Sequence, residues 1–281
     1  MAVVGLRTLR ELDFAAASGL ALAHDALWVI ADDGLQLHRL SLSGAPLARH
    51  DLFPGQAALP IEPKPRKKAK PDLEALCALP DGRLLALGSG SRRNRARCSL
   101  FDPVTHETRL IDAAPLYDSL EVDLPELNIE GACVFGNTLV LSHRGNSEGA
   151  SDALVLLDWA SILASLADGT LAAAARLALI PLQLGEIDGA RLTLTDLATD
   201  HAGQLCYSAA AEVTEDRYDD GPCAGSVIGR FDAAFQPAQQ WRLPGHFKVE
   251  GLACPGTGEW LLVADADDPE VPSPLLRFTL S

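Results

Sequence analysis

Four acidic residues stand at the start of short apolar runs that resemble one another. The runs are "LEAL" with Glu74, "IEGA" with Glu130, "TDLA" with Asp196 and "VEGL" with Glu250, and a fifth run, "SGLA", has Ser18 in the same place. A charged side chain among apolar residues is costly unless something pairs with it or binds it. Because carboxylate oxygens without histidine or cysteine favour hard cations over zinc, these acids predict a divalent-cation site, with calcium preferred to magnesium or manganese.

Each run is followed by a turn and a second apolar run that ends in polar residues. These residues are Asp32, Asp33, Ser89, Arg92, His143, Arg144, Glu212, Asp265 and Asp267. A histidine beside an arginine is typical of a general base with a clamp for phosphate or carboxylate, although a histidine at a strand end is commonly only hydrogen-bonded. As catalytic candidates we predict His143 or Glu212 to move a proton, and Arg92 and Arg144 to hold an anionic group.

The spacing of these runs indicates the fold that positions them. Positions 18, 74, 130, 196 and 250 are separated by steps of 56, 56, 66 and 54 residues. Each unit has the pattern of four short strands with turn signals between them. A repeat of this length predicts an all-β propeller with one blade per unit, in which residues early in the innermost strands converge at one mouth of a central channel. We predict five blades; a sixth would fit only in the longest step.

Three segments depart from the repeat. The last unit lacks an outer strand, so we expect "VVGLRTLREL" near the N-terminus to pair with it and close the ring. The segment 158–170, "DWASILASLADGT", has helical spacing and predicts one short helical insertion in the third blade. The segment 60–70, "PIEPKPRKKAK", joins the first two blades on the carboxylate face, either as a solvated loop or as a lid that draws an anionic ligand over a metal.

Four carboxylates at one channel mouth cannot all be ionised without help. Two like charges about 4 Å apart repel by about 4 kcal/mol at an effective dielectric constant near 20. A bound cation, arginine partners or shared protons would each relieve this repulsion. Arg92, Arg93 and Arg144 lie at or just after the ends of the second strands, on the same face as the carboxylates, and could pair with them. The sequence leaves the choice among these three open.

The starts "LEAL", "IEGA" and "VEGL", with the stretch from "TDLA" to "LCYSAAAEVTEDRYDDGPCAGS", resemble the phytase-like and SdiA-regulated-like propeller proteins of bacteria. The resemblance covers most of the chain. It implies a propeller that binds calcium in an acidic channel and hydrolyses phosphomonoesters, with Glu74, Glu130, Asp196 and Glu250 as the channel carboxylates. Ser18 in place of a carboxylate, and a ring without a lysine-rich phosphate site, depart from that family. The resemblance therefore supports the propeller fold and the acidic channel more strongly than it supports the phosphomonoesterase activity.

Composition limits the class of protein. A chain of 281 residues suits a single propeller domain over residues 1–281, and its net charge of −15 argues against binding nucleic acid or anionic membranes. The first residues do not read as a secretory signal, and the six cysteines form no CxxC pair, so we expect a cytoplasmic protein. A small anionic molecule is the expected partner, and the oligomeric state is not indicated.

Two functional classes fit these observations. The first is a cation-binding propeller that acts as a metal-dependent hydrolase of a small ester or phosphoester, in which the ion polarises the substrate and activates water. The second is a non-catalytic ligand- or protein-binding propeller with a structural arginine–carboxylate ring. A five-bladed glycosidase would need two carboxylates facing each other across a cleft, and nothing in the spacing identifies such a pair.

Overall fold

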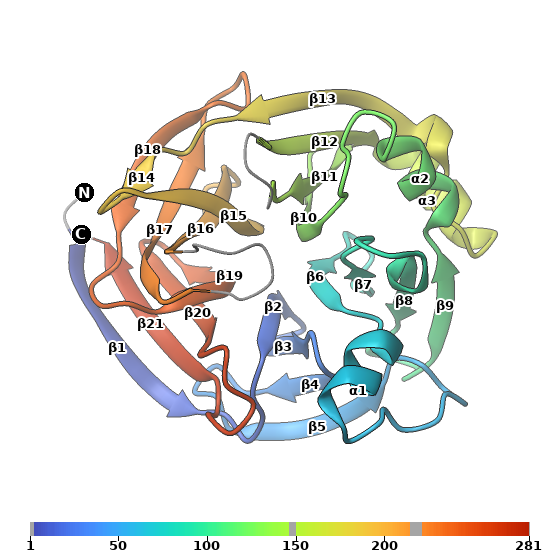
Figure 1. The fold of residues 1–281 in the computed structure, drawn as a ribbon, viewed down its shortest axis with the longest axis horizontal. Coiled ribbons are helices and arrows are strands. Elements are labelled where there is room, and N and C mark those ends of the chain that lie inside the picture. The colour runs from blue at the N-terminus through green and yellow to red at the C-terminus, as the bar shows by residue number, and fades with distance from the viewer. Residues whose placement is uncertain (1–2, 146–149, 214–220, 281) are drawn as a thin grey trace.

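The structure is a computed structural model, and it describes residues 3–145, 150–213 and 221–280. Five antiparallel sheets stand around a central axis as the blades of a propeller (Figure 1). The predicted five-bladed propeller is therefore confirmed. Within the described residues, the longest step of the repeat contains a helix and no additional blade.

In each blade the chain proceeds from the innermost strand outward, apart from the short β14 of blade IV and the outermost strand of blade V. Blade I contains β2 (Ala17–Ala23), β3 (Ala26–Ala31), β4 (Gln36–Leu40) and β5 (Pro46–Asp51). Blade II contains β6 (Leu73–Ala78), β7 (Leu84–Gly88), β8 (Arg97–Phe101) and β9 (Thr108–Asp112). Blade III contains β10 (Ile129–Phe135), β11 (Thr138–His143), β12 (Asp152–Asp158) and β13 (Arg176–Leu182). Blade IV contains β15 (Ala190–Thr199), β16 (Leu205–Glu212), β17 (Cys223–Phe231) and β18 (Pro237–Arg242), with the short β14 (Glu186–Ile187) paired to β15. Blade V contains β19 (Lys248–Gly256), β20 (Glu259–Asp265) and β21 (Pro274–Leu280).

The N-terminal strand closes the ring as predicted. Strand β1 (Val3–Glu11) pairs antiparallel with β21 and forms the outer edge of blade V, which brings the two ends of the chain side by side (Figure 1). Since β21 would otherwise be an edge strand, this pairing satisfies its outward backbone groups.

Apolar side chains from neighbouring blades fill the space between the sheets. One large cluster joins blades II and III, and another joins blades I and II. Trp28 in β3 and Trp260 in β20 are 1% and 2% exposed, in agreement with the packing expected of second strands. This interblade core holds the innermost strands at fixed positions around the axis.

The described residues contain three short α-helices between the strands, whereas the sequence predicted one. Helix α3 (Trp159–Ala167) is the predicted insertion, and Asp158 caps it by accepting a hydrogen bond from the Ser161 backbone N–H. Helices α2 (Ala114–Leu120) and α1 (Pro63–Ala69) were not predicted. Both have proline in the first turn, where its missing N–H costs nothing. In segment 60–70, where the prolines suggested a loop, a proline instead begins helix α1. No helix in the described residues is long and apolar enough to cross a membrane.

Candidate functional site

One residue of each innermost strand is set apart by a β-bulge. Pairing with the second strand skips a position between residues 17 and 19, 73 and 75, 129 and 131, 194 and 196, and 249 and 251. The residues at the skipped positions are Ser18, Glu74, Glu130, Thr195 and Glu250. Bulges redirect side chains and are common beside functional sites. Three predicted acids therefore share one level around the axis with Ser18, whose hydroxyl donates a 2.6 Å hydrogen bond to the Leu73 carbonyl.

Asp196 lies one position beyond this level, and Thr195 takes the expected place. The inner strands approach closely here, since a Cβ on Gly131 would lie 2.8 Å from the Asp196 Cα. The fully buried carboxyl group of Asp196 accepts hydrogen bonds from the backbone N–H groups of Leu197 at 2.8 Å and Leu252 at 3.0 Å. Burial raises the pKa of Asp196 well above its ordinary value. In this position Asp196 connects blade IV to blade V, and each of its carboxyl oxygens accepts a backbone hydrogen bond.

A second level of polar side chains lies at the start of the same strands, and the sequence prediction missed it. Its charged or amide-bearing members are Asp72, Asn128 and Lys248. The main chain of each pairs with the end of the second strand of its blade. The signal was present in the sequence, because these residues precede Glu74, Glu130 and Glu250 by two positions.

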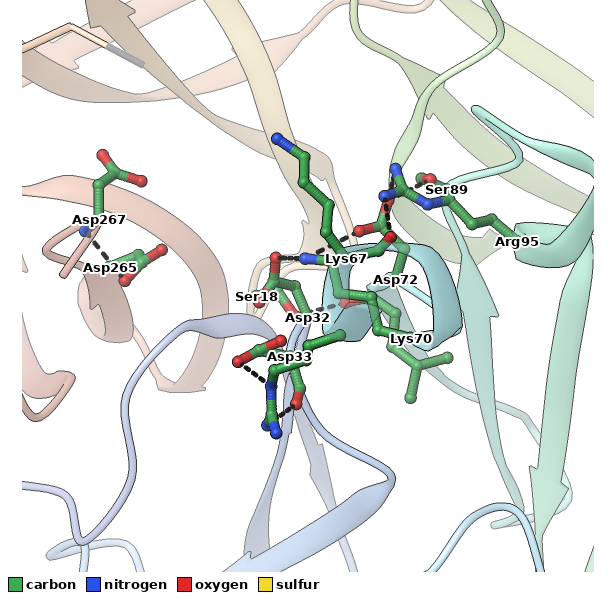
Figure 2. A network of polar contacts seen from close by, with 12 residues as sticks. Ser18, Asp32, Asp33, Lys67, Lys70, Asp72, Ser89, Arg95, Asp265 and Asp267 are labelled. Carbon is green, nitrogen blue, oxygen red and sulfur yellow. Dashed lines mark hydrogen bonds and ion pairs between the residues drawn. The ribbon is translucent and has the colours of Figure 1, made fainter. Parts of the chain in front are cut away.

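The polar groups form two clusters, and the first consists of Lys70, Asp32, Asp72, Glu74 and Arg95. We call it the Lys70 cluster (Figure 2). Lys70 donates a hydrogen bond to Asp32, and its Nζ lies 3.0 Å from Oδ1 of Asp72. Arg95 Nη1 lies 2.6 Å from Oδ2 of Asp72. The three acids each place one carboxylate oxygen within 4.8 Å of the others. Among the described residues, Glu74 has no hydrogen bond and no ion pair.

The second group, which we call the Lys248 cluster, consists of Lys248, Arg144, Glu130, Glu212, Glu250 and Asp267. The Lys248 Nζ lies 2.8 Å from Oδ1 of Asp267, 3.1 Å from Oε1 of Glu212 and 3.3 Å from Oε1 of Glu250. The Lys248 side chain is only 8% exposed. A single ammonium group therefore neutralises part of the charge of three acids from blades IV and V.

Arg144 completes the Lys248 cluster from blade III. It forms an ion pair with Glu212, its Nη1 lies 3.6 Å from Oε2 of Glu130, and its Nε donates to the Thr193 hydroxyl. Asn128 donates a 2.5 Å hydrogen bond to the other oxygen of Glu130. Glu130 is thus held by an arginine and an amide, which is one of the arrangements left open by the sequence.

The charges of the two clusters and of Asp265 do not balance. Among the described residues of this network, eight acidic side chains face four basic ones. Desolvation raises the pKa of Glu250 to about 8 and that of Asp265 to about 6, and raises the pKa of Glu74 well above its ordinary value. An excess of partly desolvated acids favours the uptake of protons or of a cation.

Two residues predicted to do chemistry have other surroundings. His143 is buried, and its Nδ1 accepts a 3.1 Å hydrogen bond from the Asn128 backbone N–H. Burial lowers the pKa of His143 to about 4, so the neutral ring carries its proton on Nε2 and has no free lone pair for a general base. Arg92 is exposed before the 3₁₀ turn η1 (Arg93–Arg95), and Arg95 makes the contact with the acids instead.

The basic segment 60–70 contains helix α1, which lies over blades I and II (Figure 1), and Lys70 follows the helix and reaches the acids (Figure 2). Arg66 fixes the helix to blade I through Asp33, with 2.5 Å between Nε and Oδ2. The segment is therefore a short helix that places one lysine among the acids, and not the solvated loop that was one of the two expectations.

A sequence profile that describes a "Family of unknown function (DUF6929)" matches residues 13–280. A search of curated protein sequences found no match.

Solved structures similar to this one include glutaminyl cyclase from Myxococcus xanthus, with 14% identity, a TM-score of 0.56, and coverage of 98% of this chain and 97% of that chain. A luciferin-regenerating enzyme has 12% identity and a TM-score of 0.50 over 98% of this chain and 95% of the other. Regucalcin, a calcium-binding protein from Agrobacterium tumefaciens, has 15% identity and a TM-score of 0.49 over 98% and 93%. At these identities the first two likenesses support the fold alone. They do not confirm the phytase-like or SdiA-regulated-like resemblance.

Proposed function

The chain belongs to this family of unknown function, and we propose from its site that the protein binds a divalent cation between Asp32, Asp72 and Glu74. The observation that carries the proposal is that each acid places a carboxylate oxygen within 4.8 Å of the other two. An all-oxygen donor set suits calcium, with magnesium and manganese as weaker candidates.

The charges around these acids support the proposal. Glu74 has no hydrogen bond or ion pair within the described part of the chain, so its oxygens are free for a ligand. Asp72 is held in place by the Ser89 hydroxyl at 2.6 Å and by Arg95, which orients one oxygen toward Asp32. Supporting partners of this kind fix the direction of a metal-binding carboxylate.

The proposed ligand set differs from the four acids predicted from the sequence. Glu130 and Glu250 lie near bases of the Lys248 cluster, and Asp196 accepts backbone hydrogen bonds. Glu74 is the one predicted acid that we retain as a ligand. Asp32 and Asp72 replace the other three.

A bound cation would polarise a substrate oxygen and lower the pKa of a bound water, which is the chemistry needed to hydrolyse a small ester or phosphoester. If the protein is such a hydrolase, an arginine must hold the small anionic substrate, and the sequence predicted Arg92 for this role. Arg95 takes that role in our proposal, because Arg95 is the arginine that contacts the acids of the Lys70 cluster. His143 is not part of it, because Asn128 occupies its Nδ1 lone pair.

A second candidate is a non-catalytic binding propeller in which the ring is structural. The pairing in the Lys248 cluster favours it, since Arg144 bridges Glu130 and Glu212 while Lys248 lies among three acids. In that case the Lys70 cluster is a further structural network and takes up no ion.

The test is thermal unfolding of chelator-treated protein with added calcium, magnesium or manganese. A ligand that binds only the folded state stabilises it by about 2.7 kcal/mol at one hundred times its dissociation constant. We expect a stabilising shift that disappears in Glu74→Gln and persists in Glu130→Gln, the matched control on the neighbouring blade. If no ion shifts the unfolding of the wild-type protein, the non-catalytic candidate takes its place.

A further inference from the structure

The proposed cation site already contains a positive charge that belongs to the chain itself. We infer that Lys70 is an internal ligand of the Asp32, Asp72 and Glu74 site, which a bound ion must displace together with helix α1. This inference rests on the proposed function and assigns its regulation.

The position of Lys70 is that of a bound cation. Its ammonium group donates to Asp32 and lies 3.0 Å from Asp72, and its side chain is 12% exposed. Figure 2 shows Lys70 approaching these acids from the segment above blades I and II. A calcium ion lies about 2.3–2.6 Å from its oxygen ligands. An ion held by the same oxygens would therefore stand beside the ammonium group, and the two like charges would repel one another.

Helix α1 is attached in a way that permits its release. The described side chains of the helix are exposed or only partly buried, and none is a buried apolar residue. Beyond Lys70, its attachments are the Arg66–Asp33 pair and hydrogen bonds from Asn94 and Arg95 to the carbonyls of Lys67, Lys68 and Lys70. Polar contacts at a surface contribute far less than a buried apolar face. Loss of the Lys70 contacts therefore removes a large share of what holds the helix.

The consequence is competition for one site. With Lys70 in place, three acids face two bases, Lys70 and Arg95. When an ion replaces Lys70, the helix loses its innermost contact and the acids become accessible from the face that α1 covered. The lysine thereby sets the ion concentration at which the site fills.

The experiment measures calcium affinity by titration calorimetry and backbone hydrogen exchange over segment 60–70. Three proteins are compared at fixed ionic strength, namely the wild type, Lys70→Gln and Lys68→Gln. Lys68 is an exposed lysine of the same helix, so its substitution matches the change in net charge without touching the acids. We expect Lys70→Gln to bind calcium at least tenfold more tightly than the other two. We also expect calcium to accelerate the backbone hydrogen exchange of segment 60–70 at least tenfold in the wild type. This second measurement does not depend on whether a variant folds.

The outcomes separate the inference from the proposed function. If the wild type binds calcium but Lys70→Gln and Lys68→Gln have equal affinities and segment 60–70 exchanges no faster, the inference is overturned while the cation site stands. If none of the three proteins binds calcium, magnesium or manganese, the proposed function is overturned and the inference with it.

Discussion

The two clusters at the propeller axis contain the same kinds of side chain but attach their bases differently. In the Lys248 cluster, Lys248 belongs to the innermost strand β19 and pairs through its main chain with Asp265, while Arg144 directly follows strand β11. In the Lys70 cluster, Lys70 follows an exposed helix that lies outside the five sheets. One cluster is therefore part of the strand framework, and the other takes a base from a connecting segment.

On the proposed function, this difference distinguishes a structural cluster from one that binds an ion. A base fixed on a core strand cannot leave its acids without disturbing the sheet, so the Lys248 cluster acts as a permanent ion network. A base on a surface segment can be exchanged for another cation at small cost to the fold. Both clusters have more acids than bases, four to two in the Lys248 cluster and three to two in the Lys70 cluster, and we propose that only the Lys70 cluster exchanges a base for an ion.

The largest expected effect comes from Lys248→Met. The substitution leaves Glu212, Glu250 and Asp267 without their shared base, at a site where the lysine is 8% exposed. Breaking a buried ion pair by removing one partner costs about 3–5 kcal/mol. Lys70→Met should cost about 1–3 kcal/mol, as expected for polar groups that lose a partner. Urea unfolding at neutral pH measures both, and equal costs would contradict the distinction between the clusters.

Asp196→Ala should have the next largest effect. It leaves the backbone N–H groups of Leu197 and Leu252 without their acceptor between blades IV and V. Unsatisfied buried donors cost about 1–3 kcal/mol each, and we expect a loss of about 3 kcal/mol in urea unfolding. Asp196→Asn keeps one acceptor oxygen but turns an NH2 group toward the other backbone N–H, so it should lose less than Asp196→Ala, by about the 1–3 kcal/mol of one unsatisfied donor. If cation binding disappeared in Asp196→Asn, Asp196 would belong to the Lys70 cluster after all.

The pH dependence of stability should come mainly from the acids beside Lys248. Desolvation raises the pKa of Glu250 from its ordinary 4.5 to about 8, and that of Asp265 from 3.8 to about 6. An acid with a raised pKa in the folded state stabilises the fold fully below its unfolded pKa and loses that contribution as pH rises through its folded pKa. Stability should therefore fall between about pH 4 and pH 6 through Asp265 and between about pH 4.5 and pH 8 through Glu250, by up to about 1.4 kcal/mol per pH unit for each group inside its own range.

Glu250→Gln provides the control for this pH dependence. The variant removes the group that titrates to about 8, so its stability curve should be flatter between pH 6 and pH 8 than that of the wild type. Urea unfolding at four pH values measures the slope. An unchanged slope in Glu250→Gln would assign the titration to another acid of the network.

The sequence predicted the blades well because each blade repeats the same local signals. The five strand starts, the closing N-terminal strand and helix α3 follow from hydrophobic period, turn residues and length. Each of these is a local property of the chain. They were sufficient to place Glu74, Glu130 and Glu250 at one level around the axis.

The site was predicted less well because its details depend on backbone register and on contacts between distant segments. Asp196 was matched to the glutamates by charge, but the bulge falls on Thr195. A shift of one residue in a strand turns the side chain to another face. Lys70 and Lys248 meet their acids through the packing of separate blades, which no local pattern in the sequence reports.

The smallest expected effect tests which arginine of "SRRNRAR" belongs to the Lys70 cluster. Arg92 is exposed, and its substitution in Arg92→Ala should change stability by less than about 0.5 kcal/mol, as is usual for surface positions. Arg95 is 8% exposed and lies 2.6 Å from Asp72, so Arg95→Ala should be clearly more costly in the same urea unfolding experiment. Because Arg95 also orients Asp72, its loss should weaken calcium binding, whereas Arg92→Ala should leave the affinity unchanged. If Arg92→Ala and Arg95→Ala bound calcium with equal affinity, Arg95 would not be needed to orient Asp72. The Ser89 hydroxyl would then be the group that holds Asp72 in place.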